Sequence, residues 1–583
     1  MGTELRRARN RQMVIFLLVC TGMVVLSSRL YYWQIMDGSA LAKAANAEHI
    51  ENQILSAPRG RIYDTTGALL ATDIVRDDVY VEPSQIVTDY PDGYQAERGQ
   101  VVQKLHAILS NVSITTLQNA LDSAQPTVRV AVSITPQQSQ QLQKQHVPYT
   151  FLQPRTWRTY PDNDLAAQIL GYVQENESGA SPQGVYGIEG MYNTQLAGKA
   201  GSVTAETDLN GNPLTVGASS EQNVVAGADI TLTIDSTMQY DVQNALEQRV
   251  QQMGAESGTA LVLNARTGAI VAMAGYPSFD PNNYGAYATD TGCRGQLEVY
   301  FNPAVYCAYE PGSTMKAVTM AAALNQNLIK PTDTIDDTGV LTFNDGTPPV
   351  YNWEQKGYGI ESMTQVLDHS ANVGAAWVAT QKLGTKGFYP YVQNFGFGQL
   401  TGVLEPESAG SYRTPTTTGW SPSDLARQSF GQGILVTPLQ MAQAYQAIAN
   451  GGTMMQPYLV SSINNNGHVT TTKPQVKRQV IRASSAKTLT GMLESVAGYE
   501  DISVPHYNVA IKTGTSTIQG LADTNTDASM IGYLPATNPQ FVVLVKLDHP
   551  TATIFGGTAS GPLWEAIAQQ LMWHYNVPPD KAS

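Results

Sequence analysis

Apolar residues predominate in one run near the N-terminus of this chain, from Met13 to Leu26. A tyrosine- and tryptophan-rich cluster follows at Tyr31–Trp33. The strict run is short for a membrane span, but Arg29 can snorkel to the interface, and the aromatic cluster is typical of an interfacial belt. The pattern therefore predicts a transmembrane helix over residues 13–33, preceded by a short tail over residues 1–12.

The charges around this run predict its orientation. Arg6, Arg7, Arg9 and Arg11 precede it, so we expect the N-terminus in the cytoplasm and the remaining chain outside the cell membrane, which it would cross once. A cleaved signal peptide is the alternative interpretation. No small-residue cleavage site is evident next to the run, because bulky tyrosine and tryptophan follow at residues 31–33, which favours an uncleaved anchor.

A mixed pattern follows the anchor over residues 34–225. Helix-like stretches occur between about residues 75 and 150, and apolar and polar residues alternate as in a strand from Thr127 to Ile134. We interpret residues 34–225 as a mixed α/β, non-catalytic pedestal domain that carries an inserted subdomain at about residues 75–150.

From residue 226 the periodicities indicate another domain. Alternation from Asp229 to Ile234 predicts a strand, and apolar residues at helical spacing from Met238 to Met253 predict a helix. Residues 259–274 predict two strands joined by a turn, and Leu563–Trp573 predicts a final amphipathic helix. Strands, a helical middle, more strands and a last helix indicate a sheet sandwiched by helices over residues 226–583. The expected fold class is multidomain α+β.

Composition narrows the range of functions. The chain has 583 residues, enough for two or three domains, and 42% of them are hydrophobic. Its net charge of −14, with no basic patch beyond the N-terminus, argues against nucleic acid as a partner. The sequence shows no phosphate-cradling glycine loop and no His, Cys and Asp cluster at metal-binding spacing. We therefore expect neither a cofactor nor a metal.

Cysteines supply one structural hypothesis. Cys293 and Cys307 lie in the part predicted to be outside the membrane, where an oxidising environment permits a disulfide. Closing a loop of this length can stabilise the fold by about 3 kcal/mol. Two unpaired thiols are the alternative. Cys20 falls in the membrane run and is expected to be a packing residue.

Ser313 and Lys316 are the candidate catalytic pair. Pro311 and Gly312 precede them and predict the start of a helix, on which positions 313 and 316 would share one face. Serine is a weak nucleophile at neutral pH and needs a base. A lysine amine can serve if burial or nearby cations lower its pKa. We therefore expect Ser313 to be the nucleophile and Lys316 its base.

Two more short motifs follow in the chain. In Ser370-Ala371-Asn372, the hydroxyl of Ser370 can relay a proton to a departing amine, and the amide of Asn372 can bind a substrate and hold Lys316. In the second motif, Lys512 can lower the pKa of Lys316 and attract a carboxylate. Thr513 and Thr515 can bind that carboxylate, and Gly514 lets the strand approach the substrate closely.

The three motifs in this order are those of the β-lactamases and penicillin-binding proteins. The chain resembles the class B penicillin-binding proteins over nearly its whole length. The resemblance also rests on residues 57–64 (Ala-Pro-Arg-Gly-Arg-Ile-Tyr-Asp), 187–190, 430–434 and 555–557. One departure is Thr65, where the family commonly has arginine; it weakens one pedestal contact at most.

This resemblance implies a D,D-transpeptidase with a penicillin-binding, β-lactamase-like domain built on an antiparallel sheet. Ser313 would attack the penultimate D-alanine of a peptidoglycan stem peptide, and an amine of a neighbouring stem would resolve the acyl-enzyme as a cross-link. Backbone N–H groups of Ser313 and Thr515 would form the oxyanion hole. β-Lactam antibiotics would trap Ser313.

The resemblance also implies protein partners: a membrane glycosyltransferase of the shape, elongation, division and sporulation type, and other proteins of the divisome or elongasome. A scaffold or activator of that glycosyltransferase, with dispensable acylation, is therefore an alternative function. The residues 431–433 (Gly-Gln-Gly) and the lack of large insertions favour a division-type over an elongation-type enzyme.

A serine β-lactamase shares the three motifs but must deacylate quickly. Class A enzymes use a glutamate-activated water for this step. Glu405-Pro406-Glu407 follows the second motif, but it lacks the Leu-Asn that would come after it in those enzymes. We therefore expect an amine, not water, as the acyl acceptor.

Overall fold

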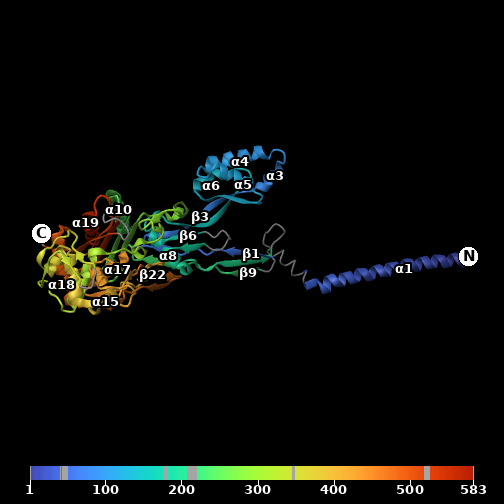
Figure 1. The fold of residues 1–583 in the computed structure, drawn as a ribbon. Helices are drawn as coiled ribbons and strands as arrows, with labels where there is room; N and C mark the ends of the chain where they lie inside the picture. Colours follow the sequence, from blue (N-terminus) through green and yellow to red (C-terminus); the bar gives the residue numbers. More distant parts are fainter. Residues whose placement is uncertain are drawn as a thin grey trace. The chain divides into compact units, whose positions relative to one another are not determined.

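The computed structural model describes residues 2–39, 41, 50–174, 182–206, 219–343, 348–517 and 525–581 (Figure 1). The chain divides into two compact units. The first comprises residues 1–58 and 198–226, and the second comprises residues 59–197 and 227–583.

The first unit contains an N-terminal helix and a small sheet. Helix α1 (Gly2–Tyr31) continues into a π-helical turn, η1 (Tyr32–Met36). Its residues 9–36 form the one helix in the described part of the chain that is long and apolar enough to cross a membrane, with mean hydropathy 2.1 and no residue buried. The predicted span 13–33 lies within it. Residues 2–12, expected as a separate tail, belong to the same helix, because arginine is a good helix former.

The sheet of this unit has the strand order β1 (Ile50–Leu55), β8 (Gly201–Glu206), β9 (Ser219–Gln222). Both pairs of neighbours run antiparallel. Segments separated by almost 150 residues of chain are thus joined by backbone hydrogen bonds.

In the second unit, a helical subdomain is inserted between two long strands. β3 (Leu69–Val81) pairs antiparallel with β5 (Thr150–Thr159) along nearly its whole length. Between them lie α3 (Pro83–Asp89), α4 (Tyr94–Ile108), α5 (Ile114–Leu121), β4 (Val128–Ile134) and α6 (Pro136–Gln145). This subdomain has its own apolar core, and β4 confirms the strand predicted from Thr127 to Ile134.

The sheet of the pedestal continues beyond the boundary expected near residue 225. Its strand order is β23 (His468–Thr471), β22 (Val460–Asn465), β10 (Asp229–Leu232), β2 (Ile62–Tyr63), β3, β4. β10 pairs parallel with β2 and antiparallel with β22. Strands from the predicted pedestal and from the predicted catalytic region therefore share one hydrogen-bonded sheet.

Residues of the sequence block at 57–64 form buried ion pairs and hydrogen bonds with distant parts of the chain. The Arg59 and Arg158 guanidinium groups lie 2.6 and 2.7 Å from the carboxylate of Glu189, which is fully buried. Asp64 accepts hydrogen bonds from the backbone N–H and the hydroxyl of Ser236, at the start of α10. At the departure Thr65, the backbone N–H, not the side chain, bonds the carbonyl oxygen of Ile234.

A five-stranded antiparallel sheet forms the centre of the second unit. Its order is β12 (Ile270–Tyr276), β11 (Ser257–Asn264), β27 (Phe541–Asp548), β26 (Thr526–Leu534), β25 (Ala510–Thr517). β26 and β27 are buried at every position, so both faces of the sheet are covered. The two strands predicted over residues 259–274 are confirmed as β11 and β12.

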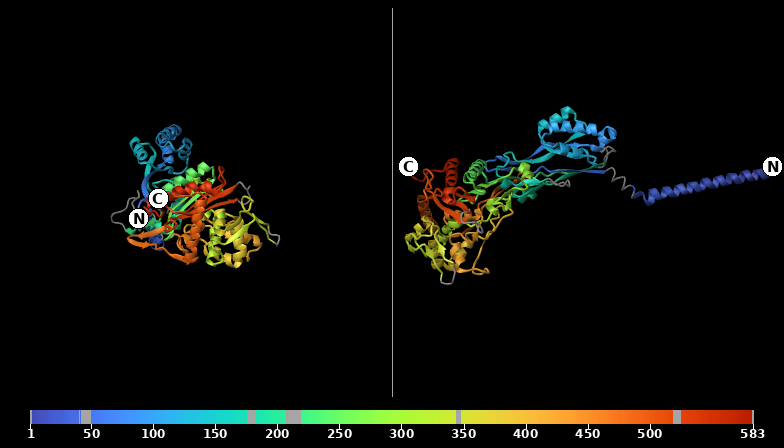
Figure 2. Two further views of the ribbon diagram at one scale, coloured as in Figure 1. Left: turned by 90° about the vertical axis from the view of Figure 1, so that its left-hand side faces the viewer. Right: turned by 45° about the horizontal axis from the view of Figure 1, so that its top comes forward.

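Helices cover this sheet on both sides. α10 (Ser236–Met253) and α19 (Gly556–His574), green and red in Figure 2, pack against each other and against the sheet. α17 (Pro438–Ala449) packs against the strands β11, β26 and β27, and is buried along nearly its whole length. The expected antiparallel sheet between helices is present, and α19 begins seven residues before the predicted helix.

Smaller elements complete the unit. Those that surround the site are η3 (Gly312–Met315), α12 (Lys316–Asn325), β15 (Thr334–Asp337), β17 (Val350–Tyr351), β18 (Gly359–Ser362), α13 (Met363–Asp368), α14 (Asn372–Trp377), α16 (Pro422–Gln428), β20 (Ile434–Leu435) and α18 (Ala483–Tyr499). The others include α7 (Ala167–Leu170), β6 (Tyr172–Gln174), β7 (Gln183–Val185), α8 (Gly187–Met191), α9 (Asn193–Leu196), η2 (Pro281–Tyr287), α11 (Pro303–Tyr306), η4 (Val378–Leu383) and α15 (Gly384–Asn394).

Candidate active site

Ser313 lies on the 3-10 turn η3, which leads directly into α12. The turn begins at Gly312, where φ is +54°. A Cβ atom on Gly312 would lie 2.7 Å from the carbonyl oxygen of Thr515, so glycine lets the turn pass close to strand β25. Tyr445, which is buried in α17, donates a hydrogen bond to the carbonyl oxygen of Thr314 and so helps to hold η3 in position.

Lys316 sits at the centre of the three motifs. Its Nζ lies 2.8 Å from Ser313 Oγ and 2.8 Å from Asn372 Oδ1. It also lies 2.5 Å from the carbonyl oxygen of Ser370 and 3.2 Å from Ser370 Oγ. These four atoms come from segments more than 50 residues apart, and the fold brings them around one amine.

The environment of Lys316 favours its neutral form. The side chain is fully buried, and this burial lowers the pKa of Lys316 well below its usual value. The charge of Lys512 lowers the pKa further, while Glu361 opposes the shift. A neutral lysine amine has a lone pair, so it can accept the proton of Ser313.

Ser370 owes its position to an unusual backbone conformation. Its φ of +54° lies in the left-handed region, which costs a serine on the order of 1–2 kcal/mol. This conformation turns both its carbonyl oxygen and its hydroxyl toward Lys316. Asn372 begins α14, and its amide also donates to the carbonyl oxygen of Tyr351 at 3.1 Å. Asn372 thus connects Lys316 to the β17 segment.

The third motif occupies β25, which is an edge strand of the central sheet. Thr513 and Thr515 line the cleft above Ser313. Lys512 is fully buried beside them, and burial lowers its pKa to about 8, against the raising effect of Glu500 and Asp368. Lys512 is therefore mostly charged at neutral pH.

Gly514 lies close to other segments of the chain. It does not appear among the residues that line the cleft. A Cβ atom at this position would lie 2.5 Å from Ser529 Oγ and 3.0 Å from the carbonyl oxygen of Pro311. The missing side chain therefore makes room for the chain's own turn before Ser313.

The glycine block at residues 430–434 supports the same turn. Gly312 donates its backbone N–H to the carbonyl oxygen of Gly431 at 3.1 Å. Gly431 has φ +83°, and a Cβ atom on it would lie 2.1 Å from the carbonyl oxygen of Gly312. Gly433 donates its N–H to the carboxylate of Glu310 at 2.9 Å.

The cleft around Ser313 has a volume of about 570 Å³. It is lined by several residues that the sequence motifs do not include: Trp353, Tyr358, His369, Tyr499, Glu500 and Phe555. The rings of Trp353 and Phe555 meet edge to face at 6.1 Å. Phe555 belongs to the quoted 555–557 block, and His369 precedes Ser370 directly, so these two had a sequence signal. Trp353, Tyr358, Glu500 and Tyr499, the last residue of α18, had none.

His369 and Glu361 form a pair next to Ser370. His369 Nδ1 lies 2.9 Å from a carboxylate oxygen of Glu361, and its ring stacks on Tyr358. Glu361 is buried, which raises its pKa to about 7; the hydrogen bond to His369 opposes this shift, and nearby Asp337 adds to it. The protonation of this carboxyl group therefore changes near neutral pH.

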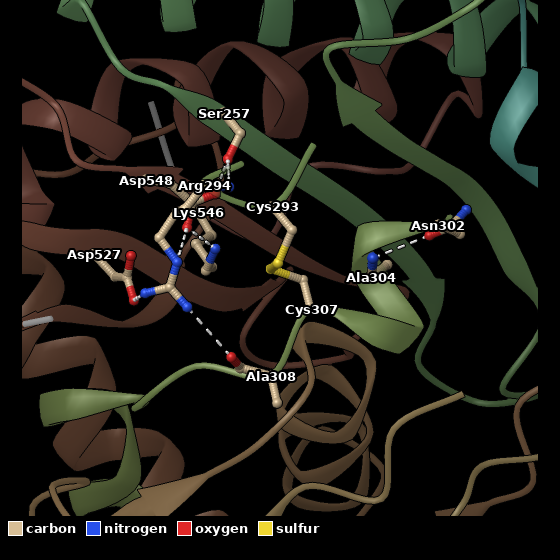
Figure 3. The surroundings of a disulfide bond; sticks show 10 residues. All are labelled: Ser257, Cys293, Arg294, Asn302, Ala304, Cys307, Ala308, Asp527, Lys546 and Asp548. Atoms are coloured by element: carbon tan, nitrogen blue, oxygen red, sulfur yellow. Dashed lines mark hydrogen bonds and ion pairs between the residues drawn. A yellow bond between two sulfur atoms is a disulfide. The ribbon is translucent and has the colours of Figure 1, made fainter. Parts of the chain in front are cut away.

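Cys293 and Cys307 are joined by a disulfide, so of the two possibilities that the sequence left open the structure has the bridge (Figure 3). The bridge closes the segment that ends six residues before Ser313. Arg294, next to Cys293, directs its guanidinium toward Asp527 and the carbonyl oxygen of Ala308 (Figure 3). The bridge and Arg294 thus tether the chain just before the nucleophile.

Comparison with known proteins identifies the family. The model of the penicillin-binding protein transpeptidase domain matches residues 258–572, and that of the penicillin-binding protein dimerisation domain matches residues 54–232. The chain belongs to the class B penicillin-binding proteins.

Relatives of this penicillin-binding protein extend over nearly its whole length. Stage V sporulation protein D of Bacillus subtilis is 29% identical over 98% of this chain and 87% of its own. A peptidoglycan D,D-transpeptidase FtsI homolog of Mesostigma viride is 28% identical over 98% of this chain and 96% of its own. A crystal structure of penicillin-binding protein 3 from Mycobacterium tuberculosis, complexed with aztreonam, matches with a TM-score of 0.66, 26% identity and coverage of 91% of this chain and 100% of that one.

Within the described residues of this penicillin-binding protein, no group of three or more His, Cys, Asp and Glu side chains could hold a metal ion.

Proposed function

We propose that this chain is a peptidoglycan D,D-transpeptidase that works through an acyl-enzyme on Ser313 and is inhibited by β-lactams. One observation carries the proposal: a buried lysine amine lies 2.8 Å from Ser313 Oγ and also contacts the second motif. The relatives named as peptidoglycan D,D-transpeptidases and the aztreonam complex of a similar protein agree with it.

In the acylation step, neutral Lys316 takes the proton of Ser313 as Oγ attacks the carbonyl carbon of the penultimate D-alanine. The negative charge that develops on the carbonyl oxygen is bound by the backbone N–H groups of Ser313 and Thr515. Removing one such donor typically slows a reaction about 10²–10³-fold. Lys316 gains a charge in this step, and its contacts with Ser370 and Asn372 stabilise that charge.

The leaving D-alanine must gain a proton as the peptide bond breaks. Ser370 Oγ lies 3.2 Å from Lys316 Nζ, so its hydroxyl can pass the proton from Lys316 to the departing amine. Lys512 attracts the terminal carboxylate, and hydroxyls of β25 bind it. An amine of a second stem peptide then attacks the ester and delivers its proton back along the same path, which completes the cross-link.

Two carboxylates bear on the β-lactamase alternative. Glu407 accepts hydrogen bonds from the backbone N–H groups of Thr401 and Gly402, at 2.6 and 2.7 Å. Neither Glu405 nor Glu407 is among the described residues that line the cleft. A glutamate able to activate water beside Ser313 is thus not provided by this segment, and an amine acceptor is favoured.

The orientation in the membrane and the protein partners also belong to this proposal. The helix at residues 9–36 supports a single membrane anchor. The arginines before its apolar run favour a cytoplasmic N-terminus and an extracytoplasmic catalytic domain. A membrane glycosyltransferase is the partner that we propose for the anchor and pedestal.

A penicillin adduct tests the proposed function. The purified full-length chain is incubated with benzylpenicillin, and the modified residue is located by mass spectrometry of peptides. We expect a long-lived adduct on Ser313 that is absent from Ser313→Ala. Rapid hydrolysis of penicillin would favour a β-lactamase, and no adduct would reject acylation chemistry. Cells that keep both growth and glycan polymerisation with Ser313→Ala would favour the scaffold function.

A further inference from the structure

Glu500 contributes a carboxylate to the wall of the Ser313 cleft. It follows α18 directly, and its backbone N–H donates to the carbonyl oxygen of Val496 at 2.9 Å. Its Oε1 accepts a hydrogen bond from the Thr513 hydroxyl at 2.8 Å. Its Oε2 lies against the first turn of α19, where a Cβ atom on Gly557 would be 3.0 Å away. Helix, edge strand and turn thus hold this carboxylate in one place.

The Thr513 hydroxyl connects Glu500 to Lys512. Lys512 Nζ lies 3.4 Å from Thr513 Oγ1, on the side where that oxygen can accept a hydrogen bond. The single proton of the hydroxyl goes to Glu500. While this bond exists, Thr513 has no proton to donate to a bound carboxylate.

Thr515 shows the opposite pattern, although it also lines the cleft. Its Oγ1 accepts the backbone N–H of Gly556 at 3.0 Å. Among the interactions of the described residues, the proton of this hydroxyl is donated to no acceptor. Thr515 can therefore donate to an anion that enters the cleft.

The titratable groups around Lys512 lie on or directly after three helices. Asp368 lies on α13, Glu500 follows α18, Lys316 begins α12, and His369 follows α13. Asp368 and Glu500 raise the pKa of Lys512 against the effect of burial, and Lys512 in turn lowers the pKa of Lys316. Glu500 is thus coupled through Lys512 to the base of the reaction.

We propose that the hydrogen bond between Glu500 and Thr513 gives Thr513 and Thr515 different functions. Thr513 links the carboxylate of Glu500 to the amine of Lys512, whereas Thr515 provides the hydroxyl that binds the terminal carboxylate of the donor peptide. Glu500 and Thr513 are then positioning residues, and Thr515 contacts the substrate. This inference rests on the proposed transpeptidase function, which supplies the carboxylate-bearing substrate.

Two β-lactams that differ only in their carboxylate separate these tasks. Benzylpenicillin carries the carboxylate, and its methyl ester does not. The second-order rate constant for acylation of the full-length chain is measured with both compounds between about pH 5 and 10, for the unmodified chain and for Glu500→Gln, Thr513→Val and Thr515→Val. Thr513→Ser is the conservative control, and the melting temperature of each variant reports folding.

For Thr515→Val we expect the preference for acid over ester to fall by about tenfold, because a hydrogen bond to a charged group is lost. Glu500→Gln and Thr513→Val should keep that preference at pH 6. In both, the loss of benzylpenicillin acylation at alkaline pH should begin about one pH unit lower, because Lys512 loses its proton more easily. Thr513→Ser should restore the original profile.

Each contrary result has a definite meaning. This inference would be overturned, with the proposed function left standing, by either of two results. In one, the loss of acylation at alkaline pH is unshifted in Glu500→Gln. In the other, Thr513→Val loses the preference for benzylpenicillin over its methyl ester as strongly as Thr515→Val. An unmodified chain that neither compound acylates would reject the proposed function, and this inference with it.

Discussion

The guanidinium of Arg294 lies 3.1 Å from the carboxylate of Asp527, inside the unit that carries Ser313 (Figure 3). Asp548 is next to it, bonded to Lys546 and to the Ser257 hydroxyl. Lys546 and Asp548 are almost completely buried. Cys293, directly before Arg294, is bridged to Cys307, and both cysteines are buried, so the disulfide helps to hold this cation beside the buried carboxylates.

Removal of the disulfide should therefore destabilise the protein. We expect the double variant Cys293→Ser, Cys307→Ser to lose about 3 kcal/mol of unfolding free energy, since the open segment gains freedom in the unfolded chain. Denaturant unfolding measures this loss, and Cys20→Ser serves as the control because it leaves the bridge intact. A reductant should have the same effect on the unmodified chain; unchanged unfolding in both cases would contradict the expectation.

The pH dependence of stability should reflect Asp527. Burial raises the pKa of its carboxyl group to about 7, while Lys546 and Arg294 oppose the shift. A carboxyl group with a raised folded-state pKa binds its proton more tightly in the folded protein, so its contribution to stability is present at low pH and is lost as pH rises from about 4 to about 7. Asp527→Asn should weaken this dependence, as measured by unfolding at pH 5 and pH 8. An equal pH effect in both proteins would refute the assignment.

Lys316 should be essential for acylation. Lys316→Met removes the base, and we expect the acylation rate constant to fall by about 10²–10⁴-fold, the range for general base catalysis. Lys316→Arg should fail similarly, because arginine stays protonated. Stopped-flow kinetics with a fluorescent penicillin measures the rate, and Lys487→Met, at an exposed position on α18, is the control. Near-normal acylation by Lys316→Met would exclude this role.

Glu361 should influence the acid side of the pH profile. Its charge raises the pKa of Lys316, so Glu361→Gln should lower that pKa and allow acylation to continue to lower pH. The exposed Glu354, which lines the cleft, provides the control variant Glu354→Gln. The measurement is the acylation rate between about pH 4 and 8. A shift to higher pH, or the same shift in both variants, would show that the local charge of Glu361 is not the cause.

Two glycines in one block allow a matched comparison. Gly431 and Gly433 both have positive φ, but only a Cβ on Gly431 would meet another atom, the carbonyl oxygen of Gly312. Both alanine variants carry backbone strain, and Gly431→Ala should in addition displace the Ser313 turn. We expect Gly431→Ala to lose at least about tenfold more acylation than Gly433→Ala, an effect of roughly 1–3 kcal/mol for overpacking. Equal losses of acylation in the two variants would mean that backbone strain, and not the contact with Gly312, causes the effect.

Much of the fold was predictable from local patterns. The strands of the central sheet alternate or form continuous apolar runs, and α10 repeats apolar residues at helical spacing, so β10, α10, β11 and β12 were all expected. The pairing of β10 with β2 and β22, which joins strands from both sides of the boundary predicted near residue 225, was not predictable, because it is a long-range contact that periodicity does not contain.

The sequence by itself identified the chemistry: an activated serine, a lysine three residues later, and two motifs that complete an acyl-transfer site. Order and spacing along the chain sufficed for this, because the residue types are chemically specific. Only the tertiary structure decided that Lys316 contacts Ser370 and Asn372, that Gly514 accommodates the Ser313 turn, and that Glu500 takes the proton of Thr513. These relationships depend on distances between segments far apart in the chain, and such distances arise from packing and burial rather than from local sequence.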